Sequence, residues 1–182
     1  MTMPDEKIEL VVEMSLRGPL ERQLVVLLDR CFPNTFEGRS YFKQIPHARV
    51  LMWRGSTLIG YAGLDHRVIR IDDAVTRVTG IVDLCVDPSY WHVGRGSALL
   101  QFAETLARGG QSNFMILFAD RADLYLRNGY RPIEPAVLTW LAIEERASHS
   151  MQRRDFSGTF MVKAISDTTF PTGEIDLLGY LF

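Results

Sequence analysis

The sequence predicts an α/β protein in which helices flank a mixed, mostly antiparallel central sheet. Three observations predict this class. Residues 50–86 hold apolar runs joined by turn residues, which is typical of antiparallel hairpins. Residues 82–127 follow the order strand, helix, strand, helix, and further apolar runs come after residue 136. Because no repeat, low-complexity segment or linker interrupts the chain, we expect a single domain, 1–182.

The N-terminal part is expected to form one strand and two helices. Residues 8–14 are a short apolar run and predict the first strand. A helix is expected to open at Pro19 and to stop before Pro33, since proline fits the first helical turn but not the interior. The apolar residues of this helix recur at helical spacing: Leu20, Leu24, Leu27, Leu28 and Cys31. Residues 34–47 predict a second, weaker helix.

A series of hairpins is expected next. Apolar runs at 50–53 and 58–64 flank Arg54-Gly55-Ser56-Thr57, a sequence typical of a hairpin turn. The second run is expected to continue for several residues. A further turn then leads into a strand over 74–86, which is rich in β-branched residues.

The second half of the chain predicts two helices and more strands. A helix follows Gly96 and ends at Gly109-Gly110, and one of its faces is apolar. That face comprises Leu99, Leu100, Ala103, Leu106 and Ala107. The later elements are a buried strand at 114–118, a short helix at 121–127 capped by Gly129, a strand at 137–143, a solvated loop at 144–155 and a last strand at 159–165.

Composition excludes several classes of function. The chain is 47% hydrophobic and 23% charged, which is ordinary for a globular protein. A net charge of −2 gives no broad basic field for nucleic acid or an anionic membrane. Two cysteines are too few for a disulfide framework. Since the N-terminus lacks a secretory signal and no apolar run is long enough to span a bilayer, we expect a cytoplasmic protein.

The junction between the strand ending at Val86 and the following helix predicts an anion site. A Gly94-Arg95-Gly96 turn delivers the chain into the helix. First-turn amides have no partner within a helix, and the helix dipole also favours an anion there. Glycine lets the backbone approach a phosphate closely. His92 and Arg95 are candidate side-chain donors.

The same turn has a structural interpretation. Gly94 and Gly96 would serve equally in a tight strand-to-helix connection that binds nothing. Two better-known phosphate motifs do not fit. No Gly-Lys-Ser/Thr follows, so this is not a Walker loop, and the third glycine of a dinucleotide fingerprint is absent.

Residues 48–140 resemble the GCN5-related N-acetyltransferase (GNAT) superfamily. Three motifs carry the resemblance, in the order and spacing of that family. Residues 82–88, Val-Asp-Leu-Cys-Val-Asp-Pro, resemble its central strand. Residues 91–96, Trp-His-Val-Gly-Arg-Gly, resemble its Arg/Gln-x-x-Gly-x-Gly/Ala coenzyme A loop. Residues 122–130, Ala-Asp-Leu-Tyr-Leu-Arg-Asn-Gly-Tyr, resemble its late helix. The resemblance therefore implies the GNAT fold, with residues 141–182 supplying the last strands and a C-terminal segment.

Two branches of the superfamily look nearest, with departures. Residues 36–41 resemble the nodulation N-acyltransferases, and residues 52–53, 97–100 and 124–125 resemble the aminoglycoside 2′-N-acetyltransferases. The leading Arg/Gln of the loop is Trp91 here, and an acidic residue common at position 82 is replaced by valine. Polar residues near Thr35 and Ser40 stand where aminoglycoside enzymes carry acids. A polycationic aminoglycoside is therefore a poor fit.

The resemblance implies direct transfer of an acetyl group from acetyl-CoA to a primary amine of a small molecule, in a ternary complex. A main-chain N–H of the central strand would hold the acyl carbonyl. Tyr125 is the expected acid for the departing thiolate, and Asp83 is the expected base, with Glu37 a weaker candidate. The residues expected to bind the coenzyme are Leu84, Cys85, Val86, His92, Val93, Gly94, Arg95, Gly96 and Ser97.

Several alternatives stay open at this point. The same chemistry could use a longer acyl donor, as in the nodulation enzymes, or the chain could bind coenzyme A without turnover. Cys85 as a covalent nucleophile is disfavoured, since no histidine is near it in sequence. The four histidines have no metal-ligand spacing, so no metal is expected. The apolar chain end, with Asp176 and the terminal carboxylate, is expected to line an acceptor pocket, dock on the core or meet a partner in a homodimer.

Overall fold

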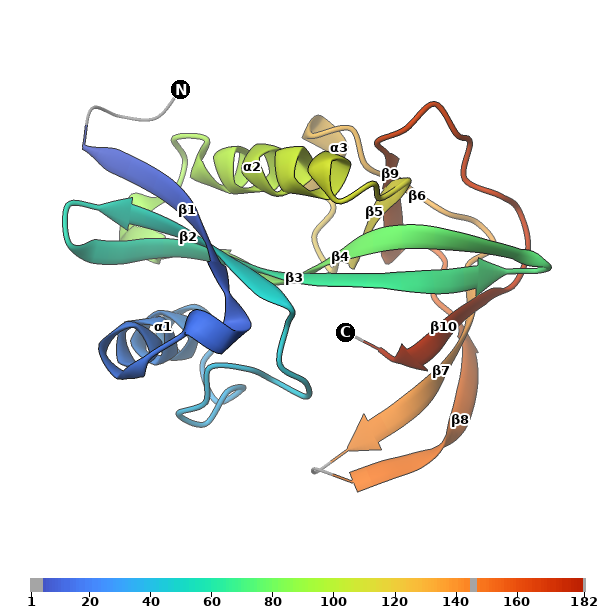
Figure 1. Cartoon of the computed structure of the whole chain (residues 1–182), viewed down its shortest axis with the longest axis horizontal. Coiled ribbons are helices and arrows are strands. Elements are labelled where there is room, and N and C mark those ends of the chain that lie inside the picture. Colours follow the sequence, from blue (N-terminus) through green and yellow to red (C-terminus); the bar gives the residue numbers. More distant parts are fainter. Residues whose placement is uncertain (1–4, 145–146, 182) are drawn as a thin grey trace. The chain divides into compact units, whose positions relative to one another are not determined.

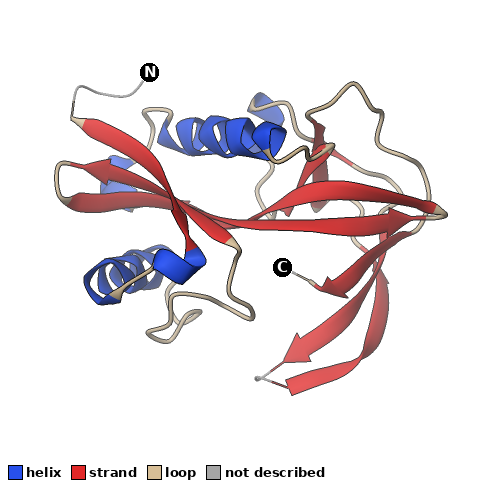
Figure 2. Ribbon diagram, viewed as in Figure 1, coloured by secondary structure: helices blue, strands red, loops and turns tan. Residues whose placement is uncertain are grey.

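The computed structural model describes residues 5–144 and 147–181, and its helices and strands form a mixed α/β architecture (Figures 1 and 2). This architecture confirms the predicted fold class. Its helices are α1 Gly18–Cys31, α2 Arg95–Gly109 and α3 Asp123–Arg127, and its 3-10 turns are η1 Glu13–Ser15 and η2 Pro88–Tyr90. Its strands are β1 Glu6–Val12, β2 Ala48–Arg54, β3 Thr57–Ile71, β4 Ala74–Val86, β5 Phe114–Phe118, β6 Arg131–Pro132, β7 Val137–Glu144, β8 Ala147–Asp155, β9 Phe160–Ala164 and β10 Ile175–Tyr180.

The chain divides into two compact units, and β3, β4 and α2 run from one into the other. The first unit comprises Met1–Asp65 and Ile81–Ala103. The second comprises His66–Gly80 and Glu104–Phe182. The single domain expected from the sequence stays a prediction, and each unit is described by itself.

The first unit is built on an antiparallel hairpin series. β1 pairs with β2 from Glu6↔Arg54 to Val12↔Ala48, and β2 pairs with β3 from Ala48↔Leu64 to Arg54↔Thr57. The predicted hairpin at residues 50–64 is thus confirmed. Helix α1 packs against this sheet (Figure 1). The apolar cluster at the contact comprises Leu16, Leu24, Leu27, Leu28, Phe36, Leu51, Leu58, Tyr61 and Cys85.

Helix α2 approaches β3 closely in the same unit. A Cβ added at Gly60 would lie 3.1 Å from Leu99 Cδ1 and 3.3 Å from Met52 Cβ. Leu99 is fully buried, as the apolar face predicted for this helix requires. The start of α2 is therefore held against the sheet by side-chain packing at a position where only glycine leaves enough room.

The second unit contains an eight-strand order, β6-β9-β5-β4-β3-β10-β7-β8. β4 and β5 are parallel, with Val78 opposite Phe114, and β10 runs parallel to β7. β10 pairs with β3, β9 with both β5 and β6, and β7 with β8, all in antiparallel orientation. Its core is an apolar cluster of buried residues from these strands and from the loops beside them: Ile69, Ile71, Val78, Phe114, Ile116, Ala136, Leu138, Phe160, Val162, Phe170, Ile175 and Leu177.

Residues 34–47 contain no helix, so the prediction of a second helix there was wrong. The backbone has positive φ angles at Asn34 (62°), Glu37 (51°) and Gly38 (75°), which a right-handed helix does not allow. Phe36 is 1% exposed and anchors the segment in the apolar cluster of the first unit. The aromatic residues of this segment, which suggested a helix, do not form a helical face. Their spacing reflects the burial of Phe36.

The polar stretch at 144–155 forms a strand where a loop was expected. β8 pairs with β7 from Val137↔Asp155 to Glu144↔Ala147, yet all nine of its residues are exposed. Backbone pairing therefore makes this strand, without the apolar alternation by which strands are found in a sequence. Residues 145 and 146, which the predicted loop included, lie outside the described part of the chain.

The strand expected to be the last, at 159–165, is followed by another. β10 lies between β3 and β7, pairing Ile175 with Ile71 and with Leu138. Ile175 and Leu177 are 1% and 0% exposed, so the apolar chain end is part of the core of the second unit. Asp176 pairs with Arg70 at 3.0 Å. The terminal carboxylate of Phe182 lies outside the described residues.

Candidate active site

The predicted phosphate-binding turn is an exposed connection that opens helix α2. Residues 91–94 are all exposed, and both His92 (φ 66°) and Gly94 (φ 84°) are left-handed. The amide of Ala98 donates to the Gly94 carbonyl at 3.0 Å. The amides of residues 95–97 therefore lie ahead of the first i to i−4 bond of the helix, in the position that suits an anion.

The Arg95 side chain points inward, so it is not placed to act as the side-chain donor that the sequence suggested. Its Nε lies 3.0 Å from Glu6 Oε1, and its Nη1 donates to the Tyr90 carbonyl at 2.8 Å. The side chains of Arg95 and Glu6 are 9% and 3% exposed, respectively. The guanidinium thus ties the turn to β1, and the main-chain amide is what Arg95 can offer a ligand.

Trp91, which replaces the Arg/Gln of the family motif, also has a structural contact. Its indole Nε1 donates to the Val86 carbonyl at 2.6 Å, so it joins the turn to the end of β4. Val93 is 63% exposed and His92 is exposed as well. The side chains of Arg95 and Trp91 therefore hold the turn in place while its tip stays open to solvent.

Asp83 interrupts the regular strand geometry of β4. It has φ 51°, and Val82, Asp83 and Leu84 are all partly exposed instead of alternating. Aspartate tolerates this left-handed conformation better than most residues. Burial raises the pKa of Asp83 to about 6, although the charge of Arg49 acts in the opposite direction. A carboxyl group with a pKa near neutrality suits a general base.

A buried arginine, Arg49, is the charge that acts on Asp83, and no pattern in the sequence predicted it. Arg49 is 0% exposed; it forms an ion pair with Glu13 and donates to the Tyr61 hydroxyl at 3.0 Å. It also donates to the Ser40 carbonyl at 2.7 Å. These residues are spread over the first third of the chain, on elements that only folding brings together.

A histidine–carboxylate pair was also missed. His47 Nδ1 lies 2.7 Å from Asp65 Oδ1, with the histidine side chain 59% exposed and the aspartate 2%. The sequence suggested only that His47 was one of four scattered histidines. Such a pair can orient an imidazole for proton transfer.

The strand segment expected to hold the acyl carbonyl ends in buried residues. Cys85 and Val86 are 7% and 9% exposed, and Leu84 is partly exposed. A hydrogen bond with Cys31, together with burial, raises the pKa of Cys85 well above its ordinary value. A thiol held protonated is a poor nucleophile, which agrees with a direct-transfer mechanism rather than an acyl-enzyme.

Tyr125 lies in the second unit, on α3, and the other predicted site residues lie in the first. Its ring packs against Tyr130 with centroids 5.9 Å apart. Burial raises the pKa of Tyr125, so its phenol is protonated throughout the neutral range. Glu37, the weaker candidate base, has a 72% exposed side chain 3.6 Å from Arg39 Nη2.

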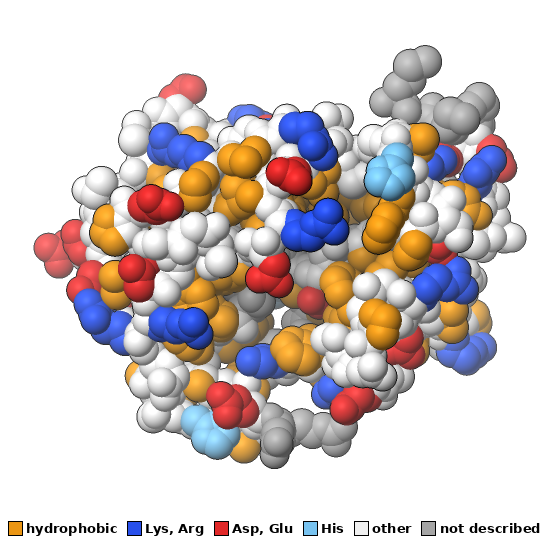
Figure 3. Space-filling model, turned by 180° about the vertical axis from the view of Figure 1, so that it is seen from behind, with side chains coloured by type: hydrophobic (Ala, Val, Ile, Leu, Met, Phe, Trp, Pro, Cys, Tyr) orange, Lys and Arg blue, Asp and Glu red, His pale blue; other side chains and the backbone are white. Residues whose placement is uncertain are grey.

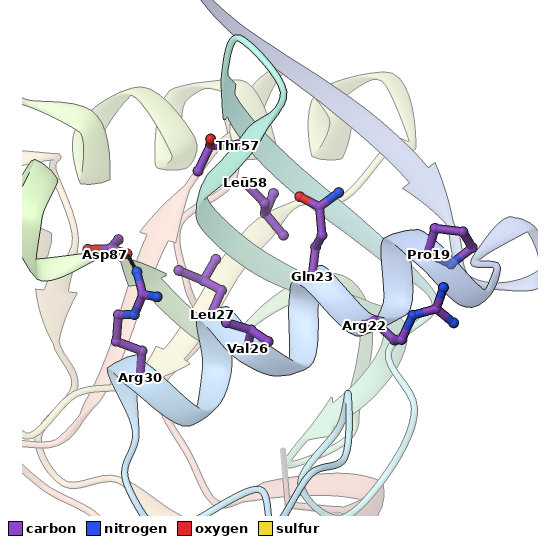
Figure 4. A pocket seen from close by; sticks show the side chains of 9 residues that line it. All are labelled: Pro19, Arg22, Gln23, Val26, Leu27, Arg30, Thr57, Leu58 and Asp87. Atoms are coloured by element: carbon purple, nitrogen blue, oxygen red, sulfur yellow. Dashed lines mark hydrogen bonds and ion pairs between the residues drawn. The ribbon is translucent and has the colours of Figure 1, made fainter.

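A cleft of about 330 Å³ lies in the first unit, between α1 and the start of β3 (Figure 4). Arg30, at the end of α1, forms an ion pair with Asp87 at one side of the cleft. The cleft is lined by Pro19, Arg22, Gln23, Val26, Leu27, Arg30, Thr57, Leu58 and Asp87. Basic and acidic side chains are interspersed on the face of the molecule that Figure 3 presents.

The described part of the chain has neither a metal-binding cluster nor a helix that could span a membrane. Within residues 5–144 and 147–181, no group of three or more His, Cys, Asp or Glu side chains is placed to hold a metal ion. None of the helices in that same part of the chain is both long and apolar enough to cross a bilayer.

The fold and the motifs identify the family. A profile described as "Acetyltransferase (GNAT) family" matches residues 22–130, more than half of the chain. The protein therefore belongs to the GNAT acetyltransferase family, and the superfamily named from the sequence is confirmed. The match to either of the two branches stays a prediction. A comparison with curated protein sequences found no match.

Solved structures with the same fold are distant in sequence. The Escherichia coli GNAT family N-acetyltransferase YhbS, solved in complex with CoA, has a TM-score of 0.66 and 16% identity, over 97% of this chain and 93% of that one. A GNAT family acetyltransferase from Brucella melitensis, in complex with acetyl-CoA, has a TM-score of 0.60 and 14% identity, over 93% and 94%. E. coli ElaA has a TM-score of 0.57 and 17% identity, over 87% and 99%. These likenesses confirm the predicted GNAT fold.

Proposed function

We propose that this protein binds acetyl-CoA at the turn of residues 92–97 and transfers the acetyl group to a primary amine of a small molecule. One observation carries the proposal. The turn is exposed and left-handed at Gly94, and it opens α2 directly after the strand that carries Asp83. A pyrophosphate bound there would accept hydrogen bonds from the first-turn amides and gain from the helix dipole. Bound CoA and acetyl-CoA in the E. coli and Brucella proteins support the choice of ligand.

The proposed reaction is direct attack in a ternary complex. The substrate ammonium loses a proton to the Asp83 carboxylate, directly or through water, and the amine attacks the thioester carbonyl. A main-chain N–H within residues 84–86 donates to the oxyanion, an interaction that can contribute about 3–4 kcal/mol. When the tetrahedral intermediate collapses, the leaving thiolate takes a proton, a step for which Tyr125 stays the residue predicted from the sequence. No acyl-enzyme forms.

Ligand binding is tested by thermal shift. A ligand at about 100 times its Kd stabilises by about 2.7 kcal/mol, which raises the Tm of a chain this size by roughly 5–10 °C. Acetyl-CoA, a longer acyl-CoA and free CoA are compared, with adenosine diphosphate as a control that carries adenosine and the linked phosphates but no pantetheine arm or thioester. No shift with any coenzyme A species would contradict the proposal.

Turnover is tested by following release of the CoA thiol against a panel of primary amines. Release with acetyl-CoA that depends on the amine supports the proposed transferase. Preferential release from the longer acyl-CoA would instead favour the nodulation-type alternative. If the coenzyme binds tightly but no amine causes release of the CoA thiol, the protein would be a coenzyme A-binding module without turnover. Aminoglycosides are included in the panel, and we expect them to be weak acceptors because polar residues near Thr35 and Ser40 stand where aminoglycoside enzymes carry acids.

A further inference from the structure

The two cysteines of the chain meet in the fold although they are far apart in the sequence. Cys31 is the last residue of α1, and Cys85 lies in β4; both are free thiols. The two thiols are close enough that each affects the pKa of the other. The Cys31 Sγ also lies 3.6 Å from the Val86 carbonyl. The apolar cluster of the first unit holds Cys85, with Cys31 packed against it.

The backbone around the two thiols is fixed by an adjacent ion pair. Arg30 precedes Cys31, Asp87 follows Val86, and the two side chains form an ion pair across the same junction (Figure 4). The Asp87 side chain is 3% exposed, and its carboxylate also accepts from the Ser89 amide at 2.9 Å. The end of α1 is thus held beside the end of β4, which reduces the movement that a disulfide would require.

The two thiols differ in reactivity in a way that suits sequential oxidation. The hydrogen bond with Cys85, assisted by the charge of Arg30, lowers the pKa of Cys31, against the opposing effects of burial and Asp87. Cys31 is partly exposed, whereas Cys85 is 7% exposed. A small oxidant therefore reaches Cys31 first and reacts with its thiolate. Cys85 is placed to form a disulfide with the oxidised Cys31.

We propose that Cys31 and Cys85 form a reversible intramolecular disulfide when the protein meets a peroxide. The Cys31 thiolate attacks the peroxide O–O bond, becomes a sulfenic acid and releases water. The Cys85 thiol passes its proton to the departing hydroxyl group as its sulfur bonds to the sulfenic sulfur, so the raised pKa of Cys85 does not block this step; the S–S bond forms and a second water leaves. Two thiols together lose two electrons and two protons, and one hydrogen peroxide becomes two waters. A dithiol reverses the change by exchange.

The disulfide also regulates the proposed acyl transfer. Cys85 lies inside residues 84–86, where a main-chain N–H is proposed to hold the acyl carbonyl. Although the adjacent ion pair limits the movement, the two free thiols must still draw together to the S–S bond length of about 2.05 Å, and this shifts the end of the strand. Since a displacement of about 1 Å in a catalytic group can lower a rate by about 100-fold, we expect at least a tenfold loss of kcat. This second step rests on the proposed function, while disulfide formation does not.

The chemistry is tested on the whole chain by denaturing, non-reducing mass spectrometry after treatment with a small excess of hydrogen peroxide. We expect a mass lower by two hydrogens, no thiol titratable by Ellman's reagent, and one cross-linked peptide containing both cysteines. Cys85→Ser should accumulate a sulfenic acid at Cys31 that dimedone traps, and Cys31→Ser should form neither product. Oxidation of Cys31 to sulfinic acid while Cys85 stays a free thiol would overturn the proposal, as would a cross-link between two chains.

The regulatory effect is tested by measuring acyl transfer before oxidation, after it, and after dithiothreitol. Wild type should lose at least tenfold in kcat and regain it with the reductant, whereas Cys31→Ser should keep its activity throughout. A disulfide that forms without changing kcat would overturn the regulatory step alone. Absence of acyl transfer in the reduced protein would contradict the proposed function, and the mass measurement would still decide whether the disulfide forms.

Discussion

The backbone of Asp83 is strained, and burial disfavours the ionised form of its carboxyl group. Its φ of 51° lies within a strand, and its pKa is raised to about 6 by burial. Strained conformations and perturbed pKa values tend to gather at functional sites. The raised pKa also means that the folded state is less stable with Asp83 ionised than with Asp83 neutral.

Asp83→Asn is expected to lower turnover and raise stability together. Asparagine keeps the shape and tolerates a positive φ, but it cannot accept a proton. Above pH 6 the ionised aspartate disfavours folding by about 2–3 kcal/mol, because its pKa rises from 3.8 to about 6 on folding. The variant should therefore have the higher Tm at pH 7.5, and the difference should shrink as the pH falls from 6 to 4.

The same variant tests the base. The wild-type kcat/KM should rise with pH through about 6 as Asp83 loses its proton, and this rise should be missing in Asp83→Asn, with a loss of roughly 10²–10⁴-fold in the plateau. An unchanged pH profile would remove Asp83 from the mechanism. The pair of His47 and Asp65 would then be the next candidate, tested by His47→Gln.

Tyr125→Phe separates a chemical role from a packing role. Phenylalanine keeps the ring contact with Tyr130 and removes only the hydroxyl. If the phenol protonates the leaving thiolate, kcat should fall by roughly 10²-fold while the Kd for acetyl-CoA stays within about twofold. Isothermal titration and steady-state kinetics measure the two quantities. Equal kcat values for the two proteins would assign Tyr125 to packing.

At the scale of elements, the junction between β4 and α2 depends on one left-handed residue. Gly94 has φ 84°, and a Cβ added there would meet nothing within 4 Å. Any cost of a side chain at this position thus comes from the backbone conformation and not from a clash. Gly158 offers a matched control, because it has φ 82° and equally open surroundings in the turn before β9.

Gly94→Ala and Gly158→Ala are expected to differ in ligand binding and not in stability. Each should cost about 1–2 kcal/mol of stability, since alanine disfavours the left-handed conformation. Gly94→Ala should also weaken acetyl-CoA binding by about tenfold or more, because relief of the strain moves the amides of residues 95–97. Gly158→Ala should bind normally. Equal affinities would place the phosphates elsewhere.

At the scale of the whole chain, the C-terminal strand completes the core of the second unit. Ile175 and Leu177 are buried there, whereas the adjacent Leu178 is 51% exposed. Leu177→Ala should destabilise by about 2–5 kcal/mol and lower the Tm by roughly 5–15 °C. Leu178→Ala should stay within about 0.5 kcal/mol. Urea denaturation measures both, and similar effects would mean that β10 contributes little to the core.

Features that depend on neighbouring residues along the chain could be predicted from the sequence. Periodicity fixed β4 at 74–86 and β5 at 114–118 with the bounds that the structure has, because apolar spacing and turn residues act over a few positions. The glycine turn was recognisable for the same reason, since a left-handed residue before a helix is a local requirement. The three ordered motifs were enough to name the superfamily.

Tertiary structure alone decided everything that depends on partners distant in sequence. β8 is a strand because it pairs with β7, and β10 is a strand because it pairs with β3 on one side and with β7 on the other. Arg95, in α2, turns inward because Glu6, in β1, accepts a hydrogen bond from its guanidinium. The meeting of Cys31 with Cys85 follows the same rule, as does the effect of Arg49 on Asp83. Such contacts produce no periodic pattern in the sequence, because the neighbours of a residue along the chain do not show which distant residue it will contact in the fold.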